Sequence, residues 1–327
     1  MLQADFACSS AALRAMLYYE ENMLKKAELN ALQAVAALSP STVAELRFSV
    51  DVTLVAVRFA LGHIKPADEK FAQIEKDIAE QDAAYLLPNF KSYETKLRLF
   101  DGDKKAASDW LENYFVTQSD HLELYKIYQH FTTARACVVL DKTEEAMRYI
   151  VRLKKLGEDF HRPLDVAEAA VLQAIVEWYT GRRKEAQDTL ETAMLSMQEY
   201  GFIRIVAEEG AAVLPILRKI SLRVERYGYA GLLQPRYIHE VTLAAYEQSK
   251  RHKGLAVHLN PKPVRLSRQQ KHILHLLAQG YKYKEIMELT GLTIHTVKSH
   301  ASAAYAKLDV NNSMDAALKA RELGLIE

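Results

Sequence analysis

The chain has 327 residues, of which 49% are hydrophobic and 26% charged, with 12 glycines and 8 prolines. This composition indicates a globular protein of two or three domains and excludes collagen-like, coiled-coil-only and disordered chains. Neither an eighteen-residue apolar run nor a signal-like start is found, so a membrane span and a secretory signal are not expected. Because only Cys8 and Cys137 could pair, the reducing cytoplasm is the expected compartment.

Charge is distributed unevenly along the chain. The whole chain has a net charge of +1, but residues 250–327 contain thirteen Lys and Arg against six Asp and Glu. That segment therefore carries +7, and residues 1–249 carry −6. A basic end on an acidic body predicts a polyanionic partner such as double-stranded DNA for the carboxyl-terminal part.

Residues 1–201 contain a repeat of about 40 residues. Residues typical of turns recur at Asn22, Gly62, Gly102, Asp141 and Gly181. Each is followed five residues later by an alanine, namely Ala27, Ala67, Ala107, Ala146 and Ala186. The pattern predicts two antiparallel helices per unit, joined where a left-handed residue ends the first helix and a small alanine allows close packing. Such hairpins bury their apolar faces by stacking, so about five units should form an all-α solenoid.

The repeat resembles tetratricopeptide-type repeats, as in "GRRKEAQDTLETAM" from Gly181, although its period exceeds their usual 34 residues. The longer period is similar to that of the extended repeats in the sensor region of MalT-like regulators. An armadillo-like or HEAT-like stack and an irregular helical bundle are the structural alternatives.

The repeat register ends near residue 201. In residues 202–248, Gly210 and Pro215 interrupt the helical pattern, which favours an atypical helical capping segment at the end of the stack. Residues 249–263 are basic, contain Pro261 and Pro263, and lack helical periodicity. They are interpreted as a solvated linker that leads into a domain at residues 264–327.

Residues 264–327 divide into four short amphipathic helices, near 267–278, 282–289, 294–307 and 313–323. Ser267 and Thr293 are the expected N-caps, and Gly280 and the turn at Gly291 separate the helices. The second and third helices with their short turn predict a helix-turn-helix. In the third helix, three-and-four spacing predicts a buried stripe of Ile294, Val297, Ala301, Ala304, Tyr305 and Leu308. The opposite face carries His295, Lys298, Ser299, Ser302 and Ala306, and its width and positive charge suit the major groove of DNA.

This domain resembles a LuxR-type helix-turn-helix. The matching positions include Leu266, Ser267, Ile273, Leu274, Gly280, Glu285, Ile286, Leu292, Thr293, Thr296, Val297, Lys298, His300, Lys307, Leu308, Val310 and Ala316. The resemblance implies that Lys298, Ser299 and Ser302 face DNA bases, with His295 beside them. It also implies that Lys282, Thr296 and Lys307 lie near the DNA backbone. Ala317, Leu318 and Arg321 of the last helix are implied to pair two domains into a homodimer on DNA.

Some positions depart from the family pattern. Gln269 and Gln270 replace an Arg-Glu pair, Tyr283 replaces a common Asn, Met287 replaces a small residue, and Ser313 replaces an Arg. Met287 lies where two helices should cross closely, so its size requires a small shift in packing. These departures affect sequence-specific contacts more than the fold.

No catalytic constellation or cofactor motif is present. MalT-like regulators usually carry an ATP-binding module, but the phosphate-binding loop motif is absent, so the chain resembles the sensor and DNA-binding half of that architecture. His272 and His275 lack a Cys or carboxylate at matching spacing, so no metal site is expected.

The main hypothesis is therefore a non-enzymatic, DNA-binding transcriptional regulator. Its repeats would sense an effector, which could be a peptide, a small molecule or a partner protein. A protein-interaction scaffold with a vestigial or dimerising helix-turn-helix is the alternative, and an undetected hydrolase in the helical body is a weaker one.

Overall fold

The computed structural model describes residues 2–114, 122–227, 233–259, 266–308, 310–322 and 325–326. These ranges form seventeen α-helices and short 3₁₀ turns without a strand, which confirms the all-α prediction. None of the helices in these ranges is long and apolar enough to cross a membrane. The chain divides into two compact units, residues 1–179 with 185–260, and residues 180–184 with 261–327.

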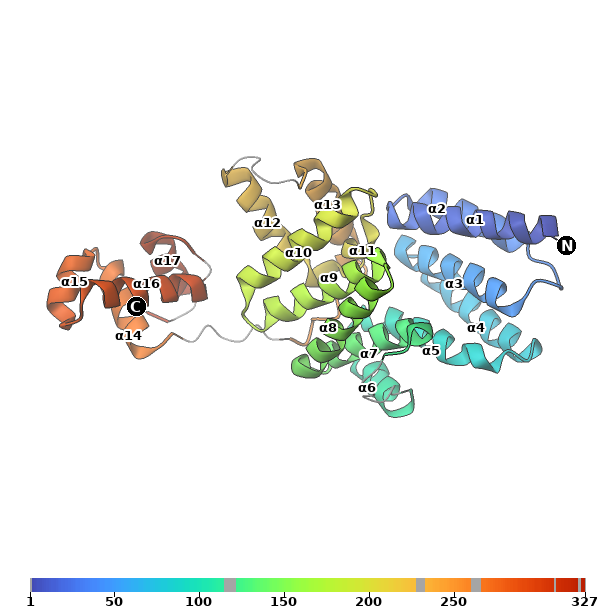
Figure 1. Ribbon diagram of the computed structural model, residues 1–327, viewed down its shortest axis with the longest axis horizontal. Coiled ribbons are helices and arrows are strands. Elements are labelled where there is room, and N and C mark those ends of the chain that lie inside the picture. Colours follow the sequence, from blue (N-terminus) through green and yellow to red (C-terminus); the bar gives the residue numbers. More distant parts are fainter. Residues whose placement is uncertain are drawn as a thin grey trace. The chain divides into compact units, whose positions relative to one another are not determined.

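Five antiparallel helical hairpins follow one another along the first unit (Figure 1). They are α1–α2 (Leu2–Glu20, Leu24–Ala36), α3–α4 (Ala44–Leu61, Ile64–Glu80), α5–α6 (Leu87–Leu99, Lys104–Asn113), α7–α8 (Ile127–Val139, Thr143–Asp159) and α9–α10 (Pro163–Tyr179, Arg183–Gln198). In the first four hairpins the two helices pack on each other, and the second helix also packs on the first helix of the next hairpin, as a solenoid requires.

The predicted turn residues have the left-handed conformation that the repeat needs. Their φ angles are 58° at Asn22, 82° at Gly62, 68° at Gly102, 58° at Asp141 and 93° at Gly181. The five alanines that follow are at most 1% exposed. A second series of left-handed residues, which the sequence reading overlooked, follows the second helices at Asp82, His161 and Gly201. The turn inside each hairpin and the turn that follows its second helix therefore repeat with the same period.

Hydrogen bonds join equivalent positions of successive first helices. Ser92 and Thr132 are 40 positions apart, and their hydroxyl oxygens lie 2.9 Å from each other. Nε2 of Gln129 donates to Oδ1 of Asn89 at 3.1 Å, again across 40 positions. α5 and α7 therefore stack in register, with equivalent residues of the two units opposite each other.

Residues 202–248, predicted as a capping segment, form α11 (Arg204–Ala207), a 3₁₀ turn, α12 (Leu214–Tyr227) and α13 (Pro235–Ser249). Leu217 and Ile220 of α12 are buried in one cluster with Leu190 and Met194 of α10. α11 instead lies against α9 and the end of α1. The backbone N–H of Ile203 donates to the carbonyl of Glu20 at 2.7 Å. This segment therefore contacts the first hairpin as well as the last.

Residues 251–259, here called the arm, differ from the solvated linker that the sequence predicts. Leu255, Ala256 and Leu259 are at most 5% exposed and belong to the core cluster of the repeats. The ring of His252 stacks on Phe59 of α3, with ring centroids 4.1 Å apart. The linker prediction is wrong for these residues because their apolar side chains follow no helical period and were overlooked. The rest of the predicted linker, from residue 260, lies outside the described residues.

The arm binds the turns between paired helices. Arg251 donates to the carbonyl of Ala60 at 2.9 Å, and the N–H of Gly254 donates to the carbonyl of Phe100 at 2.7 Å. Nε2 of His258 donates to the carbonyl of Gly102 at 2.7 Å. These bonds satisfy carbonyls at helix ends and fasten the arm to the second and third hairpins.

Gly102→Ala should therefore destabilise the protein more than Gly181→Ala. Both glycines have positive φ, so each alanine costs about 1–2 kcal/mol of backbone strain. At Gly102 a methyl group would also collide with Cγ1 of Val257 in the arm, whereas nothing lies within 4 Å of it at Gly181. Urea unfolding should show a further loss of about 1–3 kcal/mol for Gly102→Ala. Equal losses for the two variants would mean that the arm does not restrict this turn.

The second unit contains α14 (Arg268–Ala278), α15 (Tyr283–Thr290), α16 (Ile294–Leu308) and α17 (Ser313–Glu322). Ser267 caps α14, and its hydroxyl accepts from the N–H of Gln270 while the Gln270 side chain accepts from the N–H of Ser267. Ile273, Ile286 and Val297 are inaccessible and hold the first three of these helices together. The four helices lie within one residue of their predicted boundaries.

Candidate DNA-binding surface and a buried charge network of the repeats

A tight turn joins α15 to α16. Gly291 has a φ of 69°, and its N–H donates to the carbonyl of Met287 at 3.0 Å, which ends α15. Thr293 then begins α16, because its hydroxyl accepts from the N–H of Thr296 at 3.2 Å. The left-handed Gly291, which ends α15, and the Thr293 hydroxyl, which caps α16, give the helix-turn-helix geometry that the sequence predicts.

The two faces of α16 are clearly separated. Val297, Ala301, Ala304 and Leu308 are at most 1% exposed, as the three-and-four spacing predicts. The expectation for Ile294 is wrong, because this side chain is 36% exposed. It occupies the first turn of α16, where the helix begins beyond the edge of the buried cluster. Tyr305 is half-buried.

The outward face of α16 contains the residues that the sequence proposed for base contacts. His295, Lys298, Ser299 and Ser302 are all exposed on it. They occupy two adjacent turns of one helix, so they form a single continuous strip. No acidic residue occurs in α16. The positive end of the helix dipole adds to the charge of Lys298 at the first turns, which favours an anion there.

The residues proposed for backbone contacts have different environments. Lys282 is exposed at the start of α15, where its N–H donates to Oε2 of Glu285 at 2.7 Å. The Thr296 hydroxyl lies 2.8 Å from that of Thr293 and belongs to the helix cap. Nζ of Lys307 donates to Oε1 of Gln270 at 2.9 Å. Thr296 and Lys307 thus have structural roles within the domain that the sequence did not reveal.

Two departures from the family pattern meet at one side chain. The hydroxyls of Tyr283 and Tyr305 lie 3.2 Å apart. Burial, together with the bond to Tyr283, raises the pKa of the Tyr305 hydroxyl, while a bond from Ser313 opposes the rise. Tyr283 and Ser313 therefore both interact with Tyr305, and this side chain links α15, α16 and α17.

Gln270→Glu should stabilise this unit by about 0.5–1 kcal/mol. A carboxylate in the first turn of α14 would face the positive helix end and pair with the Lys307 ammonium. Hydrogen–deuterium exchange of α14 and α16 amides in the full chain should slow accordingly. In a Lys307→Ala background the gain should be smaller; an undiminished gain would show that the Lys307 pair does not form.

An open groove of about 670 Å³ lies between the end of α14 and α17. Its lining includes the three residues proposed for dimerisation, of which Ala317 is 8% exposed, Leu318 is 55% exposed and Arg321 is exposed. Met314, which the sequence reading did not single out, is 74% exposed and lines the same groove. Its position four residues before Leu318 on a helix was the signal that could have identified it.

A buried network of charges lies among α5, α7, α9 and the residues that follow α11. Arg135 of α7 is 1% exposed and donates to Glu168 of α9 at 2.6 Å and to Glu209 at 2.7 Å. Lys96 of α5 donates to Glu208 at 2.8 Å. Glu208 and Glu209 directly follow α11, so the network connects the segment after the last hairpin to the middle hairpins.

Two family models account for most of the chain. Residues 4–223 match the MalT-like TPR region, and residues 264–320 match the luxR family of bacterial regulatory proteins. The chain belongs to the MalT-like TPR family. It joins a MalT-like repeat region to a carboxyl-terminal LuxR-type helix-turn-helix domain.

One relative is the HTH-type transcriptional regulator MalT of Klebsiella pneumoniae, which is 25% identical over 231 residues. The alignment covers 68% of this chain and 26% of that regulator, so the chain matches about a quarter of the relative's length. These similarities support a DNA-binding transcriptional regulator.

Burial shifts the pKa values of the acids in and beside this charge network. Burial raises the pKa of Glu20 to about 8, and the nearby Glu208 carboxylate adds to the rise. Burial also raises the pKa of Glu209, although the nearby Arg135 guanidinium opposes the shift. Burial acts in the same direction on Glu208, but Lys96 and Arg135 outweigh it and lower the pKa.

Glu20→Gln should remove one source of pH dependence. The folded pKa of Glu20 lies above its ordinary value of 4.5, so its contribution to stability is fully present below about pH 4.5 and lost as pH rises to about 8. Over this window the stability of the parent should fall, relative to Glu20→Gln, by on the order of 1 kcal/mol per pH unit. Urea unfolding between pH 5 and pH 8 measures the difference, and parallel curves would contradict it.

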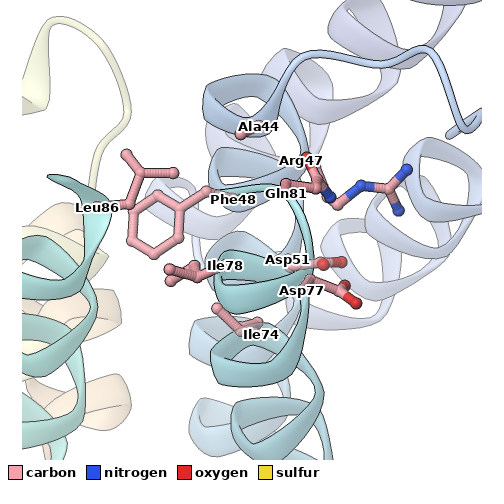
Figure 2. A pocket seen from close by; sticks show the side chains of 9 residues that line it. All are labelled: Ala44, Arg47, Phe48, Asp51, Ile74, Asp77, Ile78, Gln81 and Leu86. Carbon is pink, nitrogen blue, oxygen red and sulfur yellow. The ribbon is translucent and has the colours of Figure 1, made fainter. Parts of the chain in front are cut away.

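A small pocket lies between α3 and α4 of the MalT-like region (Figure 2). Asp51 faces it, is 1% exposed, and pairs with Lys70 at 2.7 Å. The pocket has room for about one water molecule, so it is too small for an effector. Among the described residues, no cluster of His, Cys, Asp and Glu could hold a metal ion.

Proposed function

We propose that the chain is a transcriptional regulator in which α16 enters the major groove of DNA. The observation that carries the proposal is the exposed strip of His295, Lys298, Ser299 and Ser302 on a helix without acidic residues. An α-helix fits a major groove about 12 Å wide, and side chains on its outward face can reach base edges. The match to the luxR family supports the same reading.

In this proposal Lys298, Ser299 and Ser302 contact bases, with His295 beside them. Lys282, at the exposed start of α15, contacts the DNA backbone. Thr296 and Lys307 contribute mainly by holding α16 in place, since both already bond within the domain.

Two domains pair through α17 on DNA. The groove at Met314, Ala317, Leu318 and Arg321 presents exposed apolar side chains beside a positive charge. Pairing places two recognition helices on half-sites about one helical turn apart, which raises affinity over that of a single small domain.

The repeat region senses an effector or a partner protein. The arm supports this part of the proposal, because it is fastened to turns of two hairpins and immediately precedes the stretch that leads to the DNA-binding domain. An effector or partner protein that changes the curvature of the repeats would alter the hydrogen bonds between the repeats and the arm.

Genome-wide capture of DNA fragments by the purified full chain, at two salt concentrations, tests the proposal. A recurring inverted-repeat motif supports a sequence-specific regulator. Binding that is lost at higher salt and shows no motif would reduce the function to backbone contact. Absence of binding at both salt concentrations would favour an interaction scaffold.

A further inference from the structure

Tyr305 packs against two hydrophobic clusters of the second unit. One cluster joins α14, α15 and α16 through Ile273, Ile286 and Val297, and the other joins α14, α16 and α17. Tyr305 is half-buried and lies on α16 one turn after the exposed Ser302. A change in the surroundings of Tyr305 therefore acts directly on the helix that carries the residues proposed to contact bases.

The hydroxyl of Tyr305 is held by the first residues of two other helices. It lies 3.2 Å from the hydroxyl of Tyr283, which begins α15, and it also bonds to the side chain of Ser313, which begins α17. Asparagine at position 283 and arginine at position 313, the residues of the family pattern, have no hydroxyl. This three-residue link is therefore absent from the family pattern.

Both partners of Tyr305 line the groove between α14 and α17. Tyr283 and Ser313 are half-buried and lie in its wall together with Leu318 and Arg321, which are proposed to pair two domains. Any occupant that fills the groove must therefore contact or displace the two side chains that hold the hydroxyl of Tyr305. Hydrogen bonds in a chain polarise one another, so a change at the groove is felt at α16.

We propose that Tyr305 is a positioning residue that couples the filling of this groove by a second copy of the domain to the orientation of α16. The inference rests on the proposed pairing through α17 and on the proposed reading of DNA by α16. The partner's α17, seated in the groove, fixes Tyr283 and Ser313, and their bonds to Tyr305 then fix α16. Coupling between two sites is reciprocal, so DNA bound to α16 also strengthens the pairing.

Cooperative binding of the full chain to DNA tests this coupling. The probes are the inverted repeat recovered by genome-wide capture and the same duplex with one half-site scrambled. Cooperativity is the affinity of the second chain for the inverted repeat divided by its affinity for the single half-site, and gel-shift titrations of both duplexes measure it. A merely structural role of Tyr305 would weaken binding to every half-site equally and leave this ratio unchanged.

Tyr305→Phe should lower the cooperativity about 2- to 12-fold, the range expected for loss of a hydrogen-bonded hydroxyl. Adding Tyr283→Phe should lower it no further, because the bond is already lost. Thr290→Val is the matched control: it removes a hydroxyl of α15 that donates to the carbonyl of Ile286 at 2.6 Å, and it should leave the cooperativity intact. Leu318→Glu should abolish the cooperativity, which shows that the ratio reports on pairing.

Unchanged cooperativity with Tyr305→Phe, or an equal loss with Thr290→Val, would overturn the coupling. Absence of cooperativity in the parent would contradict pairing through α17 and the coupling with it. No binding of the parent to either duplex would instead contradict the proposed reading of DNA. Failure of the coupling is therefore distinguished from failure of the proposed function.

Discussion

Arg135→Ala should lower the free energy of unfolding by about 3–5 kcal/mol, the largest effect expected of a single charge removal in this chain. The guanidinium is 1% exposed and pairs with Glu168 and Glu209. Alanine would leave the Glu209 carboxylate, also 1% exposed, without its cation in a site that excludes water. Equilibrium urea unfolding of the full chain measures the loss.

Arg98→Ala is the matched control. Arg98 pairs with Glu94 at 3.0 Å, but its side chain is 58% exposed, so its removal should cost less than about 1 kcal/mol. Combining Arg135→Met with Glu209→Leu should cost less than the sum of the two single changes, because neither charge is then left alone. Strict additivity would mean that the pair does not interact.

Lys298→Ala should weaken DNA binding by about 1–3 kcal/mol, which raises Kd about 5- to 150-fold. The side chain is exposed in the second turn of α16, where it can reach a base edge or a phosphate. Fluorescence anisotropy with the captured DNA motif measures the change. Titrations at several salt concentrations distinguish the two contacts, since loss of a phosphate contact reduces the salt slope by about one.

Lys271→Ala removes the same charge from an exposed position of α14. It should change affinity by less than Lys298→Ala because α14 carries none of the proposed base contacts. Similar losses for both variants would indicate general electrostatic attraction rather than a contact by α16. Unchanged affinity for Lys298→Ala would remove this residue from the interface.

The periodic parts of the fold could be predicted from the sequence. Left-handed turns at Gly62 or Asp141 and buried alanines such as Ala107 recur because every hairpin solves the same packing problem. The buried and exposed faces of α16 could be predicted in the same way, because the rest of the domain covers only one side of this helix. Ile294 departed from the pattern because the cluster does not reach the first turn of the helix.

Contacts between distant residues left no such pattern. Arg135 and Glu209 are 74 positions apart, and Arg251 and Ala60 are 191 apart. The only local signal was charge within otherwise apolar stretches, as at Glu208 and Glu209. The role of Lys307 was hidden in the same way, because its partner Gln270 lies 37 positions earlier.

The return of residues 203–259 to the early hairpins has a consequence for biosynthesis. A solenoid with contacts only between neighbours can fold hairpin by hairpin as it leaves the ribosome. Here Lys96 and Arg135 are made more than a hundred and more than seventy residues, respectively, before their acidic partners Glu208 and Glu209. The amino-terminal hairpins therefore complete their contacts only after the last part of this unit has been synthesised. The unit should acquire protease resistance in one late step rather than gradually.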